Sequence, residues 1–225
     1  PYPKKIETSK KFLINNYYIK YTYKQKLYEK KFFNQIRNYN LTNYLKGDNA
    51  ISYLQSIGAS LDKKNKVIIF ENNEFQINKS LELPKNWVLN FKSGSKIIFE
   101  PSKTIRVNGP IYFNGDNKNP IEIIILPPTN LSKFSWGGIS VINSEKTSSM
   151  NHVKISGVPL KTLNGKSTIL EESFRQGIDG LTGCITFYKS DVKIKNTTFE
   201  NLHCEDAINI FNSNFDIDKS IFKNI

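Results

Sequence analysis

The C-terminal stretch of the sequence decides the fold: GCITFYKSDVKIKNTTFENL (183–202) is followed, three residues later, by DAINIFNSNFDIDKSIFKNI (206–225). A shift of 23 residues overlays the two segments without a gap. Within each segment apolar and polar residues alternate, which is typical of strands rather than helices. Self-similarity at a fixed period is typical of stacked repeats. Apolar residues meet at six positions: Ile185 on Ile208, Phe187 on Ile210, Val192 on Phe215, Ile194 on Ile217, Phe199 on Phe222 and Leu202 on Ile225.

The polar residues of the two segments support the same register. Charges of opposite sign meet at three positions: Lys193 on Asp216, Lys195 on Asp218 and Glu200 on Lys223. If successive repeats form neighbouring strands, these pairs lie side by side and stabilise the sheet. Asn201 over Asn224 would form a short asparagine ladder, as stacked amides do. These charges therefore have a structural role in the predicted fold.

A repeat of this length, with three short strands and no helix, fits one coil of a parallel β-helix. We expect strands near Ile185–Phe187, Val192–Ile194 and Thr198–Phe199. The sequence thus predicts an all-β, single-stranded parallel β-helix of about 23 residues per coil. The residues expected to face the core are Ile185, Phe187, Val192, Ile194, Phe199, Ile208, Ile210, Phe215, Ile217 and Phe222.

The net charge of +12 is concentrated at the start of the chain. Residues 1–66 hold 14 lysines and arginines against 4 acids, whereas residues 67–225 hold 18 against 16. Such a basic segment can bind nucleic acid, an anionic glycan or a membrane surface. Because it is rich in Lys, Asn and Tyr and poor in Arg, we expect no specific nucleic-acid binding. No apolar run is long enough for a transmembrane helix.

Residues 1–66 are expected to form a mixed, partly helical appendage. Alternation of Ile19, Tyr21 and Tyr23 with polar residues predicts a strand, and residues 26–41 are interpreted as helical. A short helix near 49–57 would begin at Asp48 or Asn49, stop at Gly58 and lie over the open first coil.

The β-helix itself is predicted to span residues 67–225, a series of short strands without hairpin turns. WGGISVINS overlays GCITFYKS at an offset of 46, which we interpret as two repeats, and MNHVKISG overlays IKNTTFEN at 44. Between them, residues 158–182 lose the alternation and are expected to be a loop inserted at one corner. The chain begins at Pro1 and stops in mid-coil at Ile225, so we expect a longer chain, truncated here at both ends.

The two cysteines and two histidines do not define a metal site or a disulfide framework. Cys204 lies three residues short of stacking over Cys184, which exceeds the usual Cα limit of roughly 7 Å unless a corner brings the two together. Cys184 is therefore expected to be a small core residue. His152 and His203 are too far apart in the repeat to share a metal, and no cofactor is expected.

The segment from ELPKNWVLNF (82–91) onward resembles right-handed parallel β-helix domains of secreted and cell-surface bacterial proteins, in the pectate-lyase-like superfamily. The resemblance covers residues 67–225 and rests on G-S-x-I-x-F, I-x-V-x-G, N-P-I, W-G-G-I and E-D-A-I-N-I, in that order. It implies right-handed coils and an extracellular or cell-surface location. Polysaccharide lyases of this fold bind calcium through carboxylates beside a basic residue, whereas many other members show no catalysis.

The sequence offers only scattered candidates for a ligand site. Arg106 lies in a predicted strand that is not flanked by several acids. Glu205 and Asp206 are adjacent at a corner, where capping of backbone N–H groups is the simpler interpretation. Asp206 overlays Gly183, so no carboxylate lies beneath it to complete a cation cage. The candidate ligand-binding residues are Glu171, Glu172, Arg175, Asp179, Glu205, Asp206 and Trp136.

Two functions fit this pattern. The preferred hypothesis is a non-catalytic extracytoplasmic module, a structural or adhesion surface that binds polysaccharide or cell-envelope glycan weakly. The alternative is a polysaccharide lyase, hydrolase or epimerase on the same fold. A groove enzyme would line one sheet with stacked acids, a base and aromatic residues, whereas the visible coils stack Lys on Asp and Glu on Lys. Fold analogy alone does not decide between them.

Overall fold

The computed structural model describes three strands within residues 6–33, and then residues 44–126, 137–157, 183–202, 204 and 206–225. It divides the chain into two compact units, Pro1–Leu41 and Thr42–Ile225. The expected appendage of residues 1–66 is therefore divided between the two units, and its residues 42–66 belong to the larger one.

The first unit contains a three-stranded antiparallel sheet in the order β1-β2-β3. Its strands are β1 (Ile6–Ser9), β2 (Asn16–Tyr23) and β3 (Lys26–Phe33). The predicted strand around Ile19–Tyr23 is confirmed. The helical interpretation of residues 26–41 is wrong for 26–33, where aromatic residues, which favour strands, pair along the whole length of β2.

The second unit begins with β4 (Leu45–Lys46), the helix α1 (Asp48–Ser56) and β5 (Ser60–Asp62). The helix ends before Gly58, as expected, but its N-cap is Gly47 rather than Asp48 or Asn49. Asp48 instead lies in the first turn, where a carboxylate favours the positive end of the helix dipole. Ala50 and Leu54 of α1 are fully buried in the same apolar core as the coils, so the helix packs against the first coil.

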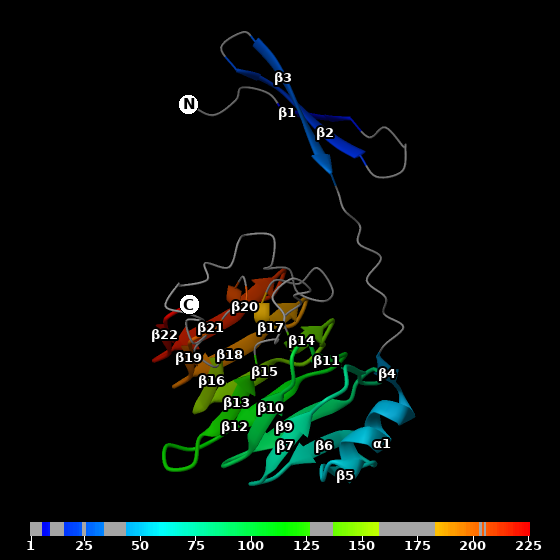
Figure 1. Ribbon diagram of the computed structural model, residues 1–225, viewed down its shortest axis with the longest axis vertical. Helices are drawn as coiled ribbons and strands as arrows, with labels where there is room; N and C mark the ends of the chain where they lie inside the picture. Colours follow the sequence, from blue (N-terminus) through cyan, green and yellow to red (C-terminus); the bar gives the residue numbers. More distant parts are fainter. Residues whose placement is uncertain are drawn as a thin grey trace, which may run out of the picture. The chain divides into compact units, whose positions relative to one another are not determined.

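The remaining strands form three sheets of stacked parallel strands (Figure 1). Sheet 1 has the order β20-β17-β14-β11-β8-β4, sheet 2 has β21-β18-β15-β12-β9-β6-β5, and sheet 3 has β22-β19-β16-β13-β10-β7. Only β5 runs antiparallel to its neighbour. The chain passes from sheet 2 to sheet 3 to sheet 1 in each coil, so the three sheets wrap one core as a solenoid.

The strand bounds follow this order around the coils. They are β6 (Val67–Phe70), β7 (Glu74–Ile77), β8 (Leu81–Glu82), β9 (Val88–Lys92), β10 (Lys96–Phe99), β11 (Thr104–Val107), β12 (Ile111–Asn114), β13 (Ile121–Ile125), β14 (Gly138–Ile142), β15 (Ser148–Asn151), β16 (Val153–Gly157), β17 (Gly183–Tyr188), β18 (Val192–Lys195), β19 (Thr198–Glu200), β20 (Asp206–Phe211), β21 (Phe215–Asp218) and β22 (Ile221–Lys223).

The register that the repeat predicts is present between the last coils. Ile185 pairs with Ile208, and Lys193 with Asp216, at the offset of 23 residues. Asn224 donates a hydrogen bond from Nδ2 to Oδ1 of Asn201 at 3.0 Å, which confirms the asparagine ladder. Ile139, however, pairs directly with Ile185. The offset of 46 is therefore one coil that contains the connection 158–182, and its interpretation as two repeats is wrong.

Alternate residues of each strand fill the core. Phe91 stacks on Phe113 with ring centroids 4.2 Å apart, and Phe70 meets the edge of Phe91 at 4.9 Å. All three rings are fully buried. Burying such a side chain contributes about 1.5–3 kcal/mol, so the repeated apolar positions supply the main stabilisation of the coils.

The core prediction holds for one coil and only partly for the last. The five predicted core residues from Ile185 to Phe199 are buried. Ile208 and Ile210 are partly buried against the core. Phe215 and Phe222 are 63% and 47% exposed. Phe222 nevertheless stacks on Phe199 at 4.7 Å, so it continues the inward stack, although no described coil packs over it.

Candidate functional site

Six of the seven residues proposed as ligand-binding from the sequence fall outside the residues that the structure describes. These are Trp136, Glu171, Glu172, Arg175, Asp179 and Glu205. Their roles stay predictions. The seventh, Asp206, begins β20 and pairs with Gly183, as expected. Its Oδ2 accepts a hydrogen bond from Nδ2 of Asn209 at 3.3 Å.

Asp206 and Asn209 lie on sheet 1, whose outer face carries a continuous row of polar residues. The register places one such residue on each of the six strands, in neighbouring positions. We call this set the polar row; its members are Lys46, Glu82, Arg106, Ser140, Thr186 and Asn209. Their chain neighbours face the core, which is why the row lies on the opposite, outer face.

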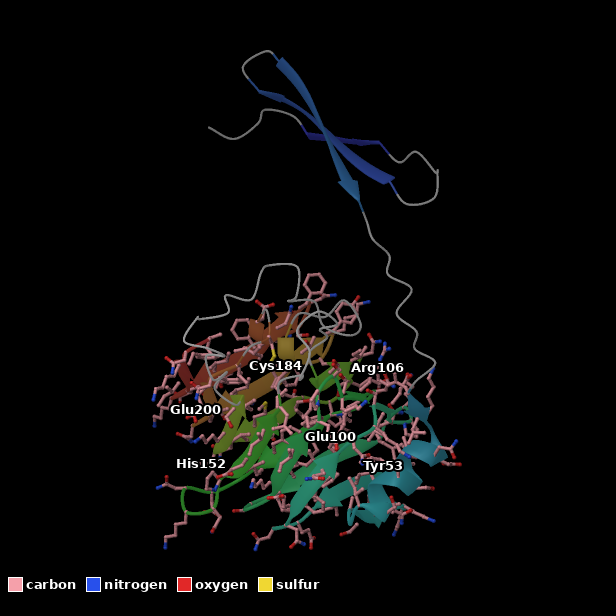
Figure 2. The ribbon with its side chains drawn as sticks, in the orientation of Figure 1. Tyr53, Glu100, Arg106, His152, Cys184 and Glu200 are labelled. Atoms are coloured by element: carbon pink, nitrogen blue, oxygen red, sulfur yellow. A yellow bond between two sulfur atoms is a disulfide. The ribbon has the colours of Figure 1, made fainter. Side chains whose placement is uncertain are left out.

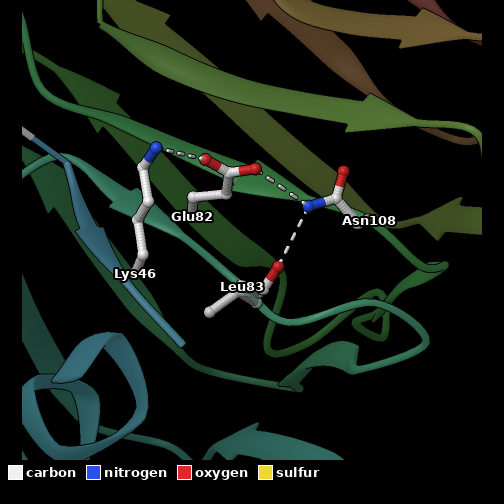
Figure 3. A network of polar contacts seen from close by, with 4 residues as sticks. All are labelled: Lys46, Glu82, Leu83 and Asn108. Atoms are coloured by element: carbon white, nitrogen blue, oxygen red, sulfur yellow. Dashed lines mark hydrogen bonds and ion pairs between the residues drawn. The ribbon is translucent and has the colours of Figure 1, made fainter. Parts of the chain in front are cut away.

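The row begins with a carboxylate held from two sides (Figure 3). Nζ of Lys46 lies 3.6 Å from Oε2 of Glu82. Nδ2 of Asn108 lies 3.4 Å from Oε1 of Glu82 and donates to the backbone oxygen of Leu83 at 3.0 Å. Lys46 of β4 and Asn108, which follows β11, thus hold this carboxylate beside Arg106. The Glu82 carboxylate therefore has a fixed position at the start of the polar row.

The middle of the row contains two buried polar atoms that have no partner in the described part of the chain. Nε of Arg106 and Oγ1 of Thr186 are buried and have no hydrogen-bond partner among the described residues. Thr186 is only 1% exposed, and Ser140 between them is 7% exposed. An unmade hydrogen bond at a buried polar atom costs about 1–3 kcal/mol. A ligand oxygen that accepted from Arg106 would recover part of this energy. Ser140 and Thr186 are covered, so the part of the row open to a ligand is Lys46, Glu82, Arg106 and Asn209, which are exposed or half-buried.

Two aromatic rings lie beside the polar row on the same face. Tyr188 and Phe211 pair in register and stack with their ring centroids 5.7 Å apart and an interplanar angle of 6°. Phe211 is 63% exposed. Nζ of Lys189 lies 5.3 Å from the centre of the Tyr188 ring, a cation–π distance. Stacked rings next to hydrogen-bonding groups suit a ligand with both apolar faces and hydroxyl groups.

A disulfide joins Cys184 and Cys204. Cys184 lies on β17, two residues before Thr186 of the polar row (Figure 2). The Cα atoms are 5.6 Å apart, within the usual range. Cys184 is fully buried in the apolar core, as expected. It also forms a disulfide, because a corner brings Cys204 to it. The corner between β19 and β20 brings Cys204 back to the start of β17. Counting residues along the repeat does not predict this approach, because it ignores the path of the corner.

The outer face of sheet 3 differs from that of sheet 1, because its charges alternate in sign. Glu74, Lys96, Glu122 and Lys154 follow one another in register on neighbouring strands. Nζ of Lys96 lies 2.7 Å from Glu74, and Nζ of Lys154 lies 2.8 Å from Glu200. Hydrogen bonding to these carboxylates raises the pKa of both lysines. Each charge thus has a neighbour of opposite sign, which stabilises the sheet.

Several other acids hold turns between strands. Asp116 accepts hydrogen bonds from Ser93 Oγ and from the backbone N–H groups of Asn119 and Lys118. These bonds lower the pKa of Asp116 to about 2. Asp191 accepts a backbone hydrogen bond from Asn214 at 2.8 Å, which lowers its pKa. These carboxylates therefore perform structural roles.

The sequence interpretation missed the polar row. The sequence around Arg106 does not show its neighbours in space, because Glu82 and Ser140 lie 24 and 34 residues away. Aligning every coil against the next would have found the row. The described residues contain no group of three or more His, Cys, Asp or Glu side chains placed to hold a metal ion. In the part of the chain that the structure describes, no helix is long and apolar enough to cross a membrane.

Comparison with protein-family models, with curated proteins and with solved structures finds no match to this chain. The stacked parallel sheets agree with the β-helix part of the resemblance. Membership of the pectate-lyase-like superfamily stays a prediction.

Proposed function

We propose that the chain is a non-catalytic extracytoplasmic module that binds glycan along the outer face of sheet 1. The polar row beside the Tyr188–Phe211 stack carries this proposal. A sugar offers hydroxyl groups on its edges and apolar C–H groups on its faces. The row supplies hydrogen-bonding groups and the stack supplies a ring surface, which together match both parts of a sugar.

The placement of the acids supports a binding role over a catalytic one. Hydrolysis of a glycoside uses two carboxylates on either side of the bond. On the polar row the one carboxylate is Glu82, and Lys46 and Asn108 hold it. On sheet 3 the carboxylates alternate with lysines.

The same proposal includes right-handed coils of about 23 residues, as the resemblance implies. Crossover connections between parallel strands are right-handed in nearly all cases.

The disulfide supports the extracytoplasmic part of the proposal. Disulfides persist in oxidising compartments and are rare in the cytosol. Both cysteines of the chain are used in this bond. The chain would therefore be stabilised where secreted proteins function.

Binding measurements on two pairs of variants test the proposal. Arg106→Gln removes a donor from the polar row, and Lys96→Gln removes the same charge from sheet 3. Losing a hydrogen bond to a charged group costs about 1.5–3 kcal/mol, so Arg106→Gln should weaken binding roughly 10- to 150-fold. Phe211→Ala should weaken it about 2- to 10-fold, as expected for a lost ring contact.

The matched control for the ring is Phe215→Ala, because Phe215 is as exposed as Phe211 but belongs to sheet 2. The ligands are a neutral glucan, an N-acetylglucosamine oligomer and a uronate polymer, each titrated by calorimetry. Binding that falls equally in Arg106→Gln and Lys96→Gln, or in both phenylalanine variants, would show that sheet 1 is not the binding face.

A further inference from the structure

The part of the polar row that is open to a ligand begins with two cations on either side of one acid. Lys46 pairs in register with Glu82, and Glu82 pairs with Arg106. Nζ of Lys46 lies 3.6 Å from Oε2 of Glu82 (Figure 3). Arg106 forms no ion pair with any described residue. Within the described part of the chain, one positive charge of this group is therefore left without a counter-charge.

Arg106 differs from exposed cations of the coils because it is partly withdrawn from water. It is half-buried, and its Nε is covered and has no hydrogen-bond partner among the described residues. Lys92 and Lys193 on sheet 2, by contrast, are exposed, so water solvates their charges. Withdrawing a charge from water is unfavourable unless a partner replaces the water. Arg106 is therefore placed to bind an anionic group of a ligand.

We propose that the glycan bound at this end of sheet 1 carries a carboxylate on every second sugar, with one carboxylate at Arg106 and the next at Lys46. This inference rests on the proposed function and names its ligand class. Arg106 and Lys46 lie two strand spacings apart, about 9.6 Å along the row. One sugar ring spans about one such spacing, so successive carboxylates of this polymer match the two cations. The planar guanidinium of Arg106 fits a carboxylate with two parallel N–H groups.

Glu82 discriminates against glycans with other charge patterns. Its carboxylate lies between the two cations and is held there by Lys46 and by Nδ2 of Asn108 at 3.4 Å (Figure 3). A polymer with a carboxylate on every sugar would place one of them over Glu82, where like charges repel, and a neutral polymer would cover Arg106 without supplying a counter-charge. The alternating polymer places an uncharged sugar over Glu82, and hydroxyl groups of that sugar can donate to the carboxylate.

Titration of the full chain with three polymers tests the inference. Hyaluronan has a carboxylate on every second sugar, polygalacturonate has one on every sugar, and dextran has none. Hyaluronan should bind more tightly than the other two. Arg106→Gln should weaken hyaluronan binding about 10- to 150-fold, because a hydrogen bond to a charged group is lost. Lys46→Gln removes an exposed charge and should weaken it about 2- to 5-fold. The matched control Lys96→Gln, which removes the same charge from sheet 3, should bind like the wild type.

Glu82→Gln tests the discrimination directly, because it keeps the size of the side chain and removes its charge. The ratio of hyaluronan affinity to polygalacturonate affinity should fall about 2- to 5-fold. An unchanged ratio, or a wild-type chain that binds polygalacturonate or dextran as tightly as hyaluronan, would overturn the inference.

Phe211→Ala separates failure of this inference from failure of the proposed function. Equal binding of the three polymers together with a loss of binding in Phe211→Ala would overturn the inference alone, because sheet 1 would still be the binding face. Equal losses in Phe211→Ala and in Phe215→Ala on sheet 2 would overturn the proposed function, and the inference with it. Preferential binding of hyaluronan that is lost in Arg106→Gln and retained in Lys96→Gln supports both.

Discussion

Breaking the disulfide between Cys184 and Cys204 should lower the free energy of unfolding by about 3 kcal/mol. The bond joins residues 20 apart in the sequence and closes one complete circuit of the coil, through β17, β18 and β19. In the chain-entropy model a closed loop of this length removes roughly 11 cal/mol/K from the unfolded state, which is about 3 kcal/mol at 25 °C. For a unit of this size that corresponds to a decrease in Tm of about 6–12 °C.

The assay is thermal unfolding followed by circular dichroism, with and without a reductant. The wild-type chain should lose stability when it is reduced, and the double variant Cys184→Ala/Cys204→Ala should show no response to the reductant. Comparing the reduced wild type with the double variant separates the covalent bond from the packing of the two buried sulfur atoms. An unchanged Tm of the wild type on reduction, or two free thiols after unfolding without reductant, would refute the reasoning.

Three further predictions concern the coils. Ile123 is fully buried between Ile97 and Ile155, so Ile123→Ala should lower the free energy of unfolding, measured in urea, by about 2–5 kcal/mol. Ile217 in the last coil is 36% exposed, so Ile217→Ala should lower it clearly less. Equal losses would contradict the assigned core. Gly138 has a φ of +145°, and a Cβ there would clash with the backbone oxygen of Cys184, so Gly138→Ala should lower Tm. Gly47 has a φ of +56° but no atom near its Cβ position, so Gly47→Ala should lower Tm less. The reverse order would show that the close contact between the two strands is absent. Hydrogen bonds hold the pKa of Asp116 at about 2, below its value in the unfolded chain. Asp116 therefore stabilises the fold above about pH 4 and loses this effect as the pH falls toward 2. The difference in stability between the wild type and Asp116→Asn should shrink over that range, and a constant difference would show that these hydrogen bonds do not stabilise the fold.

The repeat in the last 43 residues predicts the sheet register correctly because one face of each strand is buried. A slip of one residue would turn every apolar side chain outward. The pairs Lys193–Asp216 and Glu200–Lys223 then follow from simple counting. The same counting fails where a connection is inserted: it predicts that Ile139 and Ile185 lie two coils apart, although they are neighbours.

Other features depend on contacts that counting along one strand does not include. The disulfide depends on the path of a corner, and the polar row requires six strands to be aligned at once. Residues 26–33 contain apolar residues at a spacing that fits either element, and pairing with β2 makes them a strand. The exposure of Phe215 and Phe222 reflects the absence of a described coil beyond them, because their spacing matches that of Val192 and Phe199.

The central claim, that the chain binds glycan without converting it, is tested most directly by measuring product formation. The full chain is incubated with the neutral glucan, the N-acetylglucosamine oligomer and the uronate polymer, with and without calcium, and new reducing ends and unsaturated products are quantified. The account predicts no product above the level of a heat-denatured control. Turnover that disappears in Glu172→Ala or Asp206→Ala would contradict it and assign the chain to the carbohydrate-active enzymes.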